Sequence, residues 1–173
     1  MSKVAIVYWS GTGNTEQMAE SVADGARNAG ADVTTFTAAE FDADKMDEFD
    51  AIAFGCPSMG AEQLEEDEFE PMFTACESKL SGKKIALFGS YGWGDGEWMR
   101  NWDETCRNDN EILERGIARL TEKRSKVYRL NLFEGMQVSE IAQSLNLGYK
   151  AAENRLTLAR KEIRDYMKKE LAS

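Results

Sequence analysis

Three short apolar runs and one β-branched stretch alternate with helix-length segments in the N-terminal half of the chain. The apolar runs lie at residues 4–8, 50–55 and 84–89, and the β-branched stretch lies at 33–37. Strands that are buried on both faces of a parallel sheet have such continuous apolar sequences, and the helical segments between them can form the crossover connections. The sequence therefore predicts an α/β fold with a parallel sheet in this half.

Helices are predicted between these strands and throughout the rest of the chain. Met18, Val22 and Ala26 recur at helical spacing in the first helix, and residues 64–80 and 97–107 form two more. After residue 89 no strand pattern occurs, and apolar residues recur every three or four positions. The expected core positions of four later helices are Ile112, Leu113, Ile117 and Leu120, then Val127, Leu130 and Phe133, then Val138, Ile141, Ala142 and Leu145, and last Ala152, Leu156, Ala159, Ile163 and Met167.

A polar stretch at residues 108–110 separates two parts of opposite charge. Residues 1–109 have a net charge of −14, whereas residues 110–173 have a net charge of +4. We therefore expect two domains, at 1–108 and 111–173, with different partners. The acidic domain would attract a protein with a basic docking surface, and the basic one could approach the phosphates of DNA.

Composition excludes several kinds of chemistry. The chain has no histidine, and its three cysteines, Cys56, Cys76 and Cys106, form no CxxC pair. Histidine-based catalysis, histidine-ligated metals and thiolate zinc sites are therefore not expected. No apolar segment approaches the roughly 20 residues that span a bilayer, and no secretory signal is evident. A cytoplasmic protein without a membrane partner is expected.

A glycine- and hydroxyl-rich loop follows the first predicted strand. It consists of Ser10, Gly11, Thr12, Gly13, Asn14 and Thr15. Backbone amides, small hydroxyl groups and a helix N-terminus suit a phosphate monoester held without basic side chains. The loop is neither a Walker loop nor a complete dinucleotide fingerprint. From the loop alone, an ordinary turn between a strand and a helix is an equal alternative.

Two further loops follow the third and fourth predicted strands, at 56–62 and 90–96. The carboxyl ends of parallel strands form the edge at which open α/β sheets bind ligands. Met59 and Trp93 stand in these loops, and a flat heteroaromatic ring could lie between them. The alternative is that both side chains fold back onto the core.

These three loops in this order resemble those of flavodoxins, especially short-chain flavodoxins of anaerobic bacteria, from residue 4 to about residue 103. The resemblance implies non-covalent FMN and one-electron transfer, by an electron carrier rather than an enzyme with a substrate of its own. It also implies that Met59 and Trp93 flank the flavin ring, the Gly60 peptide faces flavin N5, and Glu62 binds N3. The phosphate would be held by Ser10, Thr12, Asn14 and Thr15, and the remaining expected FMN-binding residues are Gly11, Gly13, Ser58, Ser90, Tyr91 and Gly92.

The resemblance ends before a flavodoxin-like fold is complete. Such a sheet has five strands in the order 2-1-3-4-5, but only the first four are predicted here. We therefore expect a truncated sheet whose fourth strand is an exposed edge. Three alternatives follow: the helical segment covers the gap, chains complement one another in an oligomer, or this half folds poorly.

The helical part contains the segments Leu120-Thr121-Glu122-Lys123-Arg124, Phe133-Glu134-Gly135-Met136 and Val138-Ser139-Glu140-Ile141-Ala142, followed by Arg155-Leu156. With these segments, residues of about 111–171 resemble the fourth region of bacterial sigma factors, which reads promoter DNA through a helix-turn-helix. Residues 138–145, the turn Asn146-Leu147-Gly148 and residues 149–170 fit that motif, and the second helix would enter the major groove. The alternative is a charged helix in a small bundle. The candidate DNA-binding residues are Lys150, Glu153, Asn154, Arg155, Thr157 and Arg160.

The sequence therefore predicts an FMN-binding, flavodoxin-like electron-transfer module, joined as a chimera to an all-α, sigma-type helix-turn-helix. Its partners would be a basic redox protein and DNA. Two other readings remain open. The chain could be a DNA-binding transcription protein whose α/β half is a scaffold or sensor, or an engineered hybrid in which neither activity is intact.

Overall fold

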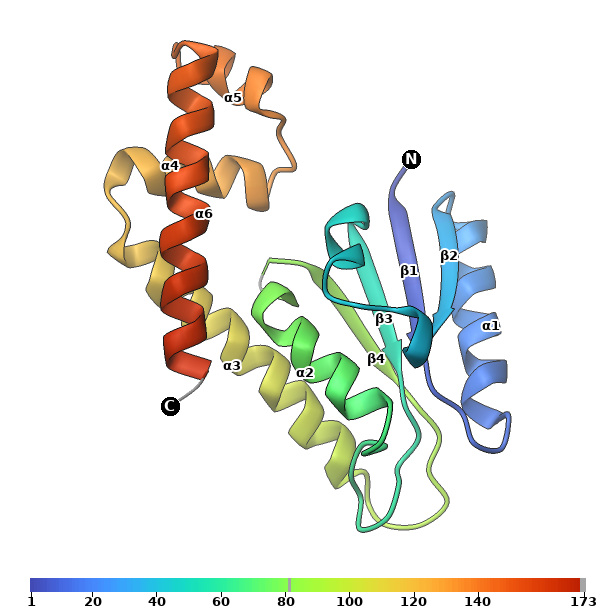
Figure 1. Cartoon of the computed structure of the whole chain (residues 1–173). Coiled ribbons are helices and arrows are strands. Elements are labelled where there is room, and N and C mark those ends of the chain that lie inside the picture. The colour runs from blue at the N-terminus through green and yellow to red at the C-terminus, as the bar shows by residue number, and fades with distance from the viewer. Residues whose placement is uncertain (81, 172–173) are drawn as a thin grey trace. The chain divides into compact units, whose positions relative to one another are not determined.

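The computed structural model describes residues 1–80 and 82–171. The chain divides into two compact units, one up to Arg107 and one from Asn108 onward (Figure 1). The first unit contains a parallel sheet, whereas the described part of the second is helical. No helix among the described residues is long and apolar enough to cross a membrane.

The sheet has four parallel strands in the order β2-β1-β3-β4 (Figure 1). Their bounds are β1 Lys3–Tyr8, β2 Asp32–Thr37, β3 Ala51–Gly55 and β4 Lys84–Phe88. The residues of β1 and β3 are mostly buried, which explains their continuous apolar sequences. The prediction of a parallel sheet is confirmed, and no fifth strand occurs among the described residues.

Helices and two short 3₁₀ turns complete the first unit. They are α1 Asn14–Asn28, η1 Ala38–Glu40, η2 Lys45–Glu48, α2 Phe69–Leu80 and the first part of α3 Glu97–Arg119. Helix α1 covers one face of the sheet, where its buried Ala19 and Ala23 join Ile6 and Ala53 in a small core. The predicted stripe of Met18, Val22 and Ala26 lies beside this contact and is only partly buried.

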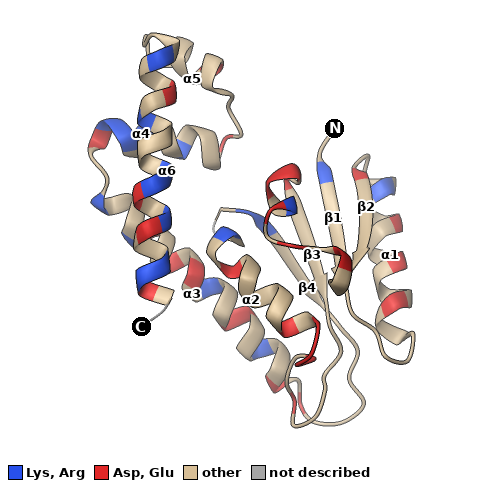
Figure 2. Ribbon diagram, viewed as in Figure 1, with Lys and Arg blue, Asp and Glu red and all other residues tan. Residues whose placement is uncertain are grey.

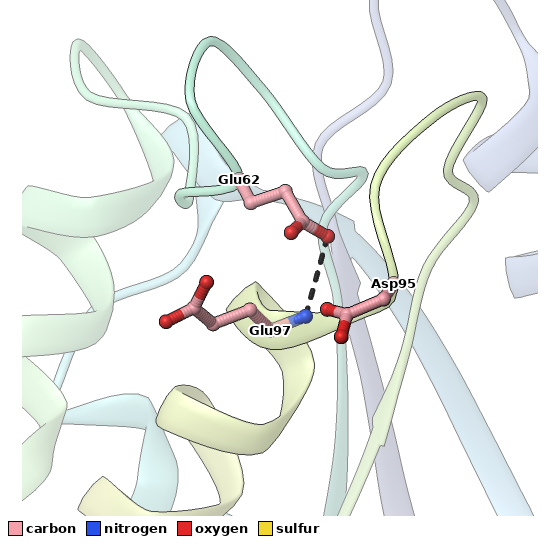
Figure 3. Close-up of side chains that lie close together, drawn as sticks. All are labelled: Glu62, Asp95 and Glu97. Atoms are coloured by element: carbon pink, nitrogen blue, oxygen red, sulfur yellow. Dashed lines mark hydrogen bonds between the residues drawn. The ribbon is translucent and has the colours of Figure 1, made fainter.

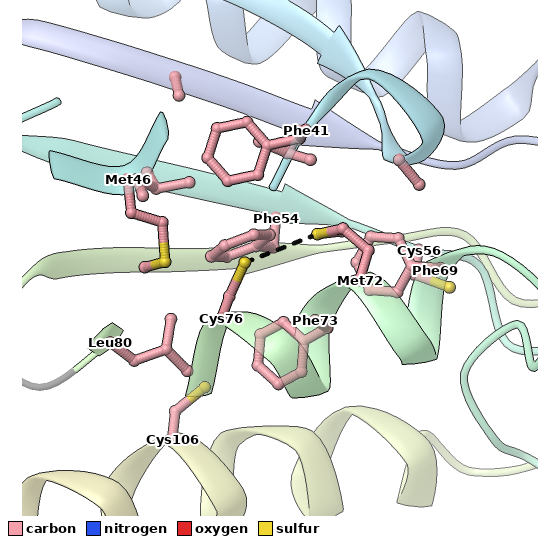
Figure 4. Packing of buried hydrophobic residues seen from close by; sticks show 14 of the residues in the cluster. Phe41, Met46, Phe54, Cys56, Phe69, Met72, Phe73, Cys76, Leu80 and Cys106 are labelled. Carbon is pink, nitrogen blue, oxygen red and sulfur yellow. Dashed lines mark hydrogen bonds between the residues drawn. The ribbon is translucent and has the colours of Figure 1, made fainter. Parts of the chain in front are cut away.

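The larger core lies on the other face of the sheet, with residues of α2 and α3 (Figure 4). Phe54 of β3 meets Phe73 of α2 edge to face, with ring centroids 5.2 Å apart. Cys56, Cys76 and Cys106 are buried in this core as free thiols. Burial raises the pKa of Cys56 and of Cys76 to about 12, so both thiols stay protonated at neutral pH.

Two predicted helix bounds are wrong. The helix expected at 64–80 begins only at Phe69. The reason is that the Glu65 carboxylate accepts hydrogen bonds from the amides of Asp67, Glu68 and Phe69, so Glu65 itself lies before the helix. The break expected at 108–110 is absent, since these residues lie inside α3. Asn and Asp cost a helix only a fraction of a kcal/mol each, about 0.7 at most, and no glycine or proline interrupts this stretch.

The second unit contains the end of α3, α4 Glu122–Leu132, α5 Val138–Ser144 and α6 Tyr149–Leu171. Its core includes Ile117, Val127, Ile141 and Leu156, each at a predicted core position. Phe133 is an exception and is 50% exposed. It follows the last turn of α4, where its ring lies under the guanidinium of Arg129 at 5.6 Å.

Candidate functional site

The loop between β1 and α1 presents backbone amides and hydroxyl groups at the start of a helix. Gly13 precedes α1 with φ of 87°, a left-handed conformation that glycine adopts at little cost. Its amide donates to Ser10 Oγ at 3.0 Å. Within the described residues, the amides of Thr12, Asn14 and Thr15 donate to no protein acceptor. Such donors at a helix N-terminus suit an anion.

The loop after β3 forms a tight turn whose two ends pair with each other. The Met59 amide donates to the Gln63 carbonyl at 2.9 Å, and the Gln63 amide donates back at 3.0 Å. Between them, Gly60 (φ 47°) and Glu62 (φ 55°) adopt left-handed backbone conformations. Glu62 is strained there, which is a frequent property of ligand-binding loops. Met59 is 37% exposed, so it does not fold back onto the core.

The loop after β4 begins with a close backbone approach and then carries two exposed aromatic side chains. A Cβ atom on Gly89 would lie 1.9 Å from the carbonyl oxygen of Cys56, so only glycine fits there. Tyr91 is 62% exposed and Trp93 is 65% exposed. Large apolar groups left in water at one place commonly mark a binding surface. The alternative that Trp93 packs onto the core is therefore wrong.

Ser90 connects all three loops at the carboxyl edge of the sheet. Its carbonyl accepts a hydrogen bond from the Ser58 amide at 2.9 Å. Its hydroxyl shares a hydrogen bond with that of Thr15 at 3.2 Å, and Thr15 is almost completely buried. The phosphate-type loop and the two loops with exposed Met59 and Trp93 thus form one cluster.

A carboxylate joins the second and third loops directly (Figure 3). Glu62 Oε1 accepts hydrogen bonds from the amides of Gly96, at 2.9 Å, and Glu97, at 3.2 Å, so it binds the N-terminus of α3. The carboxylates of Asp95 and Glu97 approach that of Glu62, with one oxygen of each within 4.8 Å of the others. Negative charge therefore gathers beside the exposed aromatic side chains.

The second unit contains two helices joined by a short, well-defined turn. Helix α5 ends in a Schellman motif: the Leu147 amide donates to Ala142 O at 2.8 Å, and the Asn146 amide donates to Gln143 O at 3.2 Å. Asn146 has the left-handed conformation this motif requires, with φ of 50°. After Gly148, α6 begins at once. This geometry agrees with the predicted helix-turn-helix.

The candidate DNA-binding side chains lie together on the first half of α6, where Lys and Arg are frequent (Figure 2). Lys150, Glu153, Asn154, Thr157 and Arg160 are exposed, and Arg155 is partly buried. Arg160 has a structural partner, because its guanidinium donates to Asn131 Oδ1 of α4 at 2.8 Å. Lys150 forms no ion pair within the described residues.

The flavodoxin family model matches residues 6–110, which is more than half of the chain. The chain belongs to the flavodoxin family. The flavodoxin of Clostridium beijerinckii is 54% identical over 99 residues, covering 57% of this chain and 72% of that protein. The flavodoxin of Megasphaera elsdenii is 52% identical over 101 residues, covering 58% and 74%. Flavodoxins are electron carriers rather than enzymes that turn over a substrate.

Solved flavodoxin structures also resemble this one. The solution structure of two-electron reduced Megasphaera elsdenii flavodoxin gives a TM-score of 0.59 at 49% identity, covering 61% of this chain and 77% of that chain. A flavodoxin from the domain Archaea gives 0.55 at 30% identity, covering 62% and 74%. Residues 110–163 match a different family model, Sigma-70, region 4. Both resemblances expected from the sequence are confirmed, and the chain joins the two family segments.

The structure adds contacts that sequence reasoning did not assign to any residue of these loops. The backbone amides of Gly96 and Glu97 hold the Glu62 carboxylate, and Gln63 closes the turn around Gly60. The Gly-Asp-Gly sequence before α3 does signal a turn at that place. However, no local pattern shows that a carboxylate 34 residues earlier binds there.

Proposed function

We propose that the flavodoxin-family unit binds FMN and serves as an electron-transfer module. The observation that carries this proposal is the cluster of three loops at one sheet edge, in which Met59 and Trp93 remain exposed beside a loop of unpaired amides. FMN, when bound, supplies reversible one-electron chemistry. The protein would bind the phosphate, hold the ring and shield it from water.

The phosphate would be held by residues that offer donors but no positive charge. Ser10, Thr12, Asn14 and Thr15 supply amide and side-chain groups at the N-terminus of α1, where the helix dipole favours negative charge. The Thr15 hydroxyl is already placed by its contact with Ser90. The donor set therefore fits a phosphate monoester.

The flavin ring would lie between the side chains of Met59 and Trp93. Sulfur and indole groups both contact flat heteroaromatic rings favourably. Gly60 and Glu62 would face the edge of the ring. Because the Glu62 carboxylate also binds the amides of Gly96 and Glu97, binding at the ring edge would share or replace these bonds.

Removing the indole of Trp93 tests this proposal. Trp93→Ala is expected to weaken FMN binding by about 5- to 150-fold, by analogy with the 1–3 kcal/mol that aromatic stacking contributes per base. The measurement is FMN titration of the protein by fluorescence quenching, with visible absorption spectra recorded after free flavin is removed. Trp93→Phe should retain most of the affinity, because it keeps an aromatic face.

A matched control is Tyr149→Ala, which removes a similarly exposed aromatic side chain from the second unit. It should leave FMN affinity unchanged. If the wild-type protein retains no flavin band after loading, the electron-transfer proposal fails. If wild-type protein binds FMN and Trp93→Ala binds it equally well, the stacking role of Trp93 is wrong.

The acidic character of this unit favours a basic redox partner. Residues 1–109 carry a net charge of −14, and the carboxylates of Glu62, Asp95 and Glu97 lie beside the proposed flavin site. Such a field attracts a positively charged docking surface and accelerates encounter at low salt.

We further propose that the second unit binds DNA through α6. The observation in favour is the α5–α6 pair with its Schellman turn, together with exposed polar side chains at the start of α6. Lys150, Asn154 and Thr157 would reach phosphates or base edges in the major groove. Arg160 would position α6 against α4 through Asn131 rather than contact DNA alone.

Lys150→Ala is expected to weaken binding to a labelled duplex of mixed sequence, measured by gel retardation or fluorescence anisotropy. Because one phosphate contact is lost, the slope of log K against log salt concentration should fall in magnitude by about 1. Lys168→Ala removes the same charge from the far end of α6 and serves as the control. Equal effects of both substitutions, or binding that does not depend on salt, would contradict specific docking of the α6 N-terminus.

A further inference from the structure

The two edges of the sheet differ in chemical character. β2 exposes Asp32 and three threonines, the polar pattern by which natural sheets protect an edge. β4 has the sequence Lys-Ile-Ala-Leu-Phe, which is typical of a strand with neighbours on both sides. Nevertheless β4 pairs only with β3 among the described strands, and no residue of β4 is fully buried. The sequence of β4 is therefore typical of an inner strand of a sheet, but no described strand pairs with its second edge.

The free edge of β4 has a defined set of backbone donors and acceptors. The Phe88 carbonyl accepts from the Cys56 amide, so Phe88 directs its polar backbone groups toward β3. Because this direction alternates along a strand, Ala86 and Lys84 also face β3, whereas Ile85 and Leu87 direct their N–H and C=O groups to the free edge. Neither Ile85 nor Leu87 has a hydrogen bond on that side within the described residues.

We propose that this edge binds the same edge of a second copy, as an antiparallel β4–β4 pair. A two-fold axis at Ala86 places Ile85 of one copy opposite Leu87 of the other, so that each such pair exchanges two hydrogen bonds. This register requires that the N–H and C=O groups of Ile85 and Leu87 face the second copy, and both residues do direct these groups to the free edge. The two four-stranded sheets would then form one continuous sheet.

The side chains of β4 are self-complementary in this register. Ile85 and Leu87 meet as apolar pairs on the face that carries the larger core. On the other face Ala86 meets its own copy, where its small, exposed side chain permits the close approach of a non-hydrogen-bonded pair. Lys84 stands opposite Phe88, so no like charges face each other. A second copy therefore fits the edge without any change in the strand.

Charge substitutions at the axis test this interface. Sedimentation velocity of the full chain over about a hundredfold range of concentration should show a reversible monomer–dimer equilibrium. Ala86→Lys and Ala86→Glu each place two like charges opposite each other and should raise the dissociation constant about fivefold. An equimolar mixture of the two variants should associate at least as well as the wild type. Thr34→Lys, on the exposed β2 edge, is the control and should associate normally.

Because Ala86 is exposed, both variants should keep the wild-type circular dichroism spectrum, and they should also keep the wild-type thermal midpoint at a concentration low enough for the chain to be monomeric. Leu87→Pro gives a second test, since proline at an outward-facing edge position removes the donor that the second copy would use and no hydrogen bond to β3. Leu87→Ala is its control, because both substitutions remove the partly buried leucine side chain but alanine keeps the donor. A wild-type chain that stays monomeric throughout would overturn the proposal, as would unchanged association of Ala86→Lys. If the chain stays monomeric but binds a peptide with the last strand of a complete flavodoxin, the occupant is a foreign strand and the dimer proposal is wrong.

Discussion

Gly89→Ala is expected to destabilise the first unit by about 3 kcal/mol, at the upper end of the cost of overpacking. The added Cβ would lie 1.9 Å from the Cys56 carbonyl oxygen and 2.5 Å from the Trp98 ring. Backbone cannot move aside as the end of a flexible side chain can, so β3 and β4 would have to separate at their carboxyl ends. The measurement is urea unfolding followed by circular dichroism.

The same displacement should reduce FMN affinity, because Cys56 and Gly89 begin the two loops that hold Met59 and Trp93. Gly92→Ala, three residues later, is the matched control. A Cβ on Gly92 meets nothing within 4 Å, so the stability of this variant should remain close to wild type. Equal stability of the two variants would show that the Cys56 carbonyl oxygen does not lie close enough to Gly89 to clash with an added Cβ.

Glu65→Ala should lower the free energy of unfolding at neutral pH by about 2 kcal/mol. Glu65 is buried, and its carboxylate accepts hydrogen bonds from the amides of Asp67, Glu68 and Phe69 at 3.1, 2.9 and 2.8 Å. The substitution leaves these three donors without their acceptor at the start of α2. Thermal and urea unfolding would measure the loss.

The stabilisation that Glu65 provides should decrease when the pH is lowered. Burial alone would raise the pKa of Glu65, but the amides of Phe69, Glu68 and Asp67 lower it below its ordinary value of 4.5. The stabilisation is therefore complete above that value and disappears as the pH falls through the lower pKa of the folded state. The stability difference between wild type and Glu65→Ala should accordingly shrink in acid.

Glu68→Ala is the control for this prediction, since Glu68 lies in the same acidic segment but is exposed. It should change stability by less than about 0.5 kcal/mol. A difference between wild type and Glu65→Ala that stays constant down to acidic pH would mean that the charge of Glu65 does not contribute through these amides.

Local sequence was sufficient for the strands, because the buried β1 and β3 are continuously apolar and β2 is rich in β-branched residues. It was also sufficient for the turn of the helix-turn-helix, where Asn146 itself adopts the left-handed conformation that ends α5. It failed at residues 108–110, which are helical because buried side chains on both sides of them hold the helix. Local propensities of Asn and Asp are too weak to break a helix held in this way.

The residue types of the candidate site could also be found in the sequence, because glycines, hydroxyls and aromatic residues followed three predicted strands. The exposure of Met59 and Trp93 could not, since a loop of the same composition can fold either outward or onto a core. Nor could the contact of Glu62 with the amides of Gly96 and Glu97, which depends on two loops being brought together by the sheet.

The sequence by itself thus determined the strands, most of the helices, the absence of histidine chemistry, and the two family segments joined in one chain. Only the tertiary structure decided that Ser90 links three loops, that Arg160 is held by Asn131, and that the Glu62 carboxylate binds the amides at the start of α3. The physical reason is that periodicity and backbone conformation are local properties of the chain. Contacts between distant segments exist only once the elements have packed together.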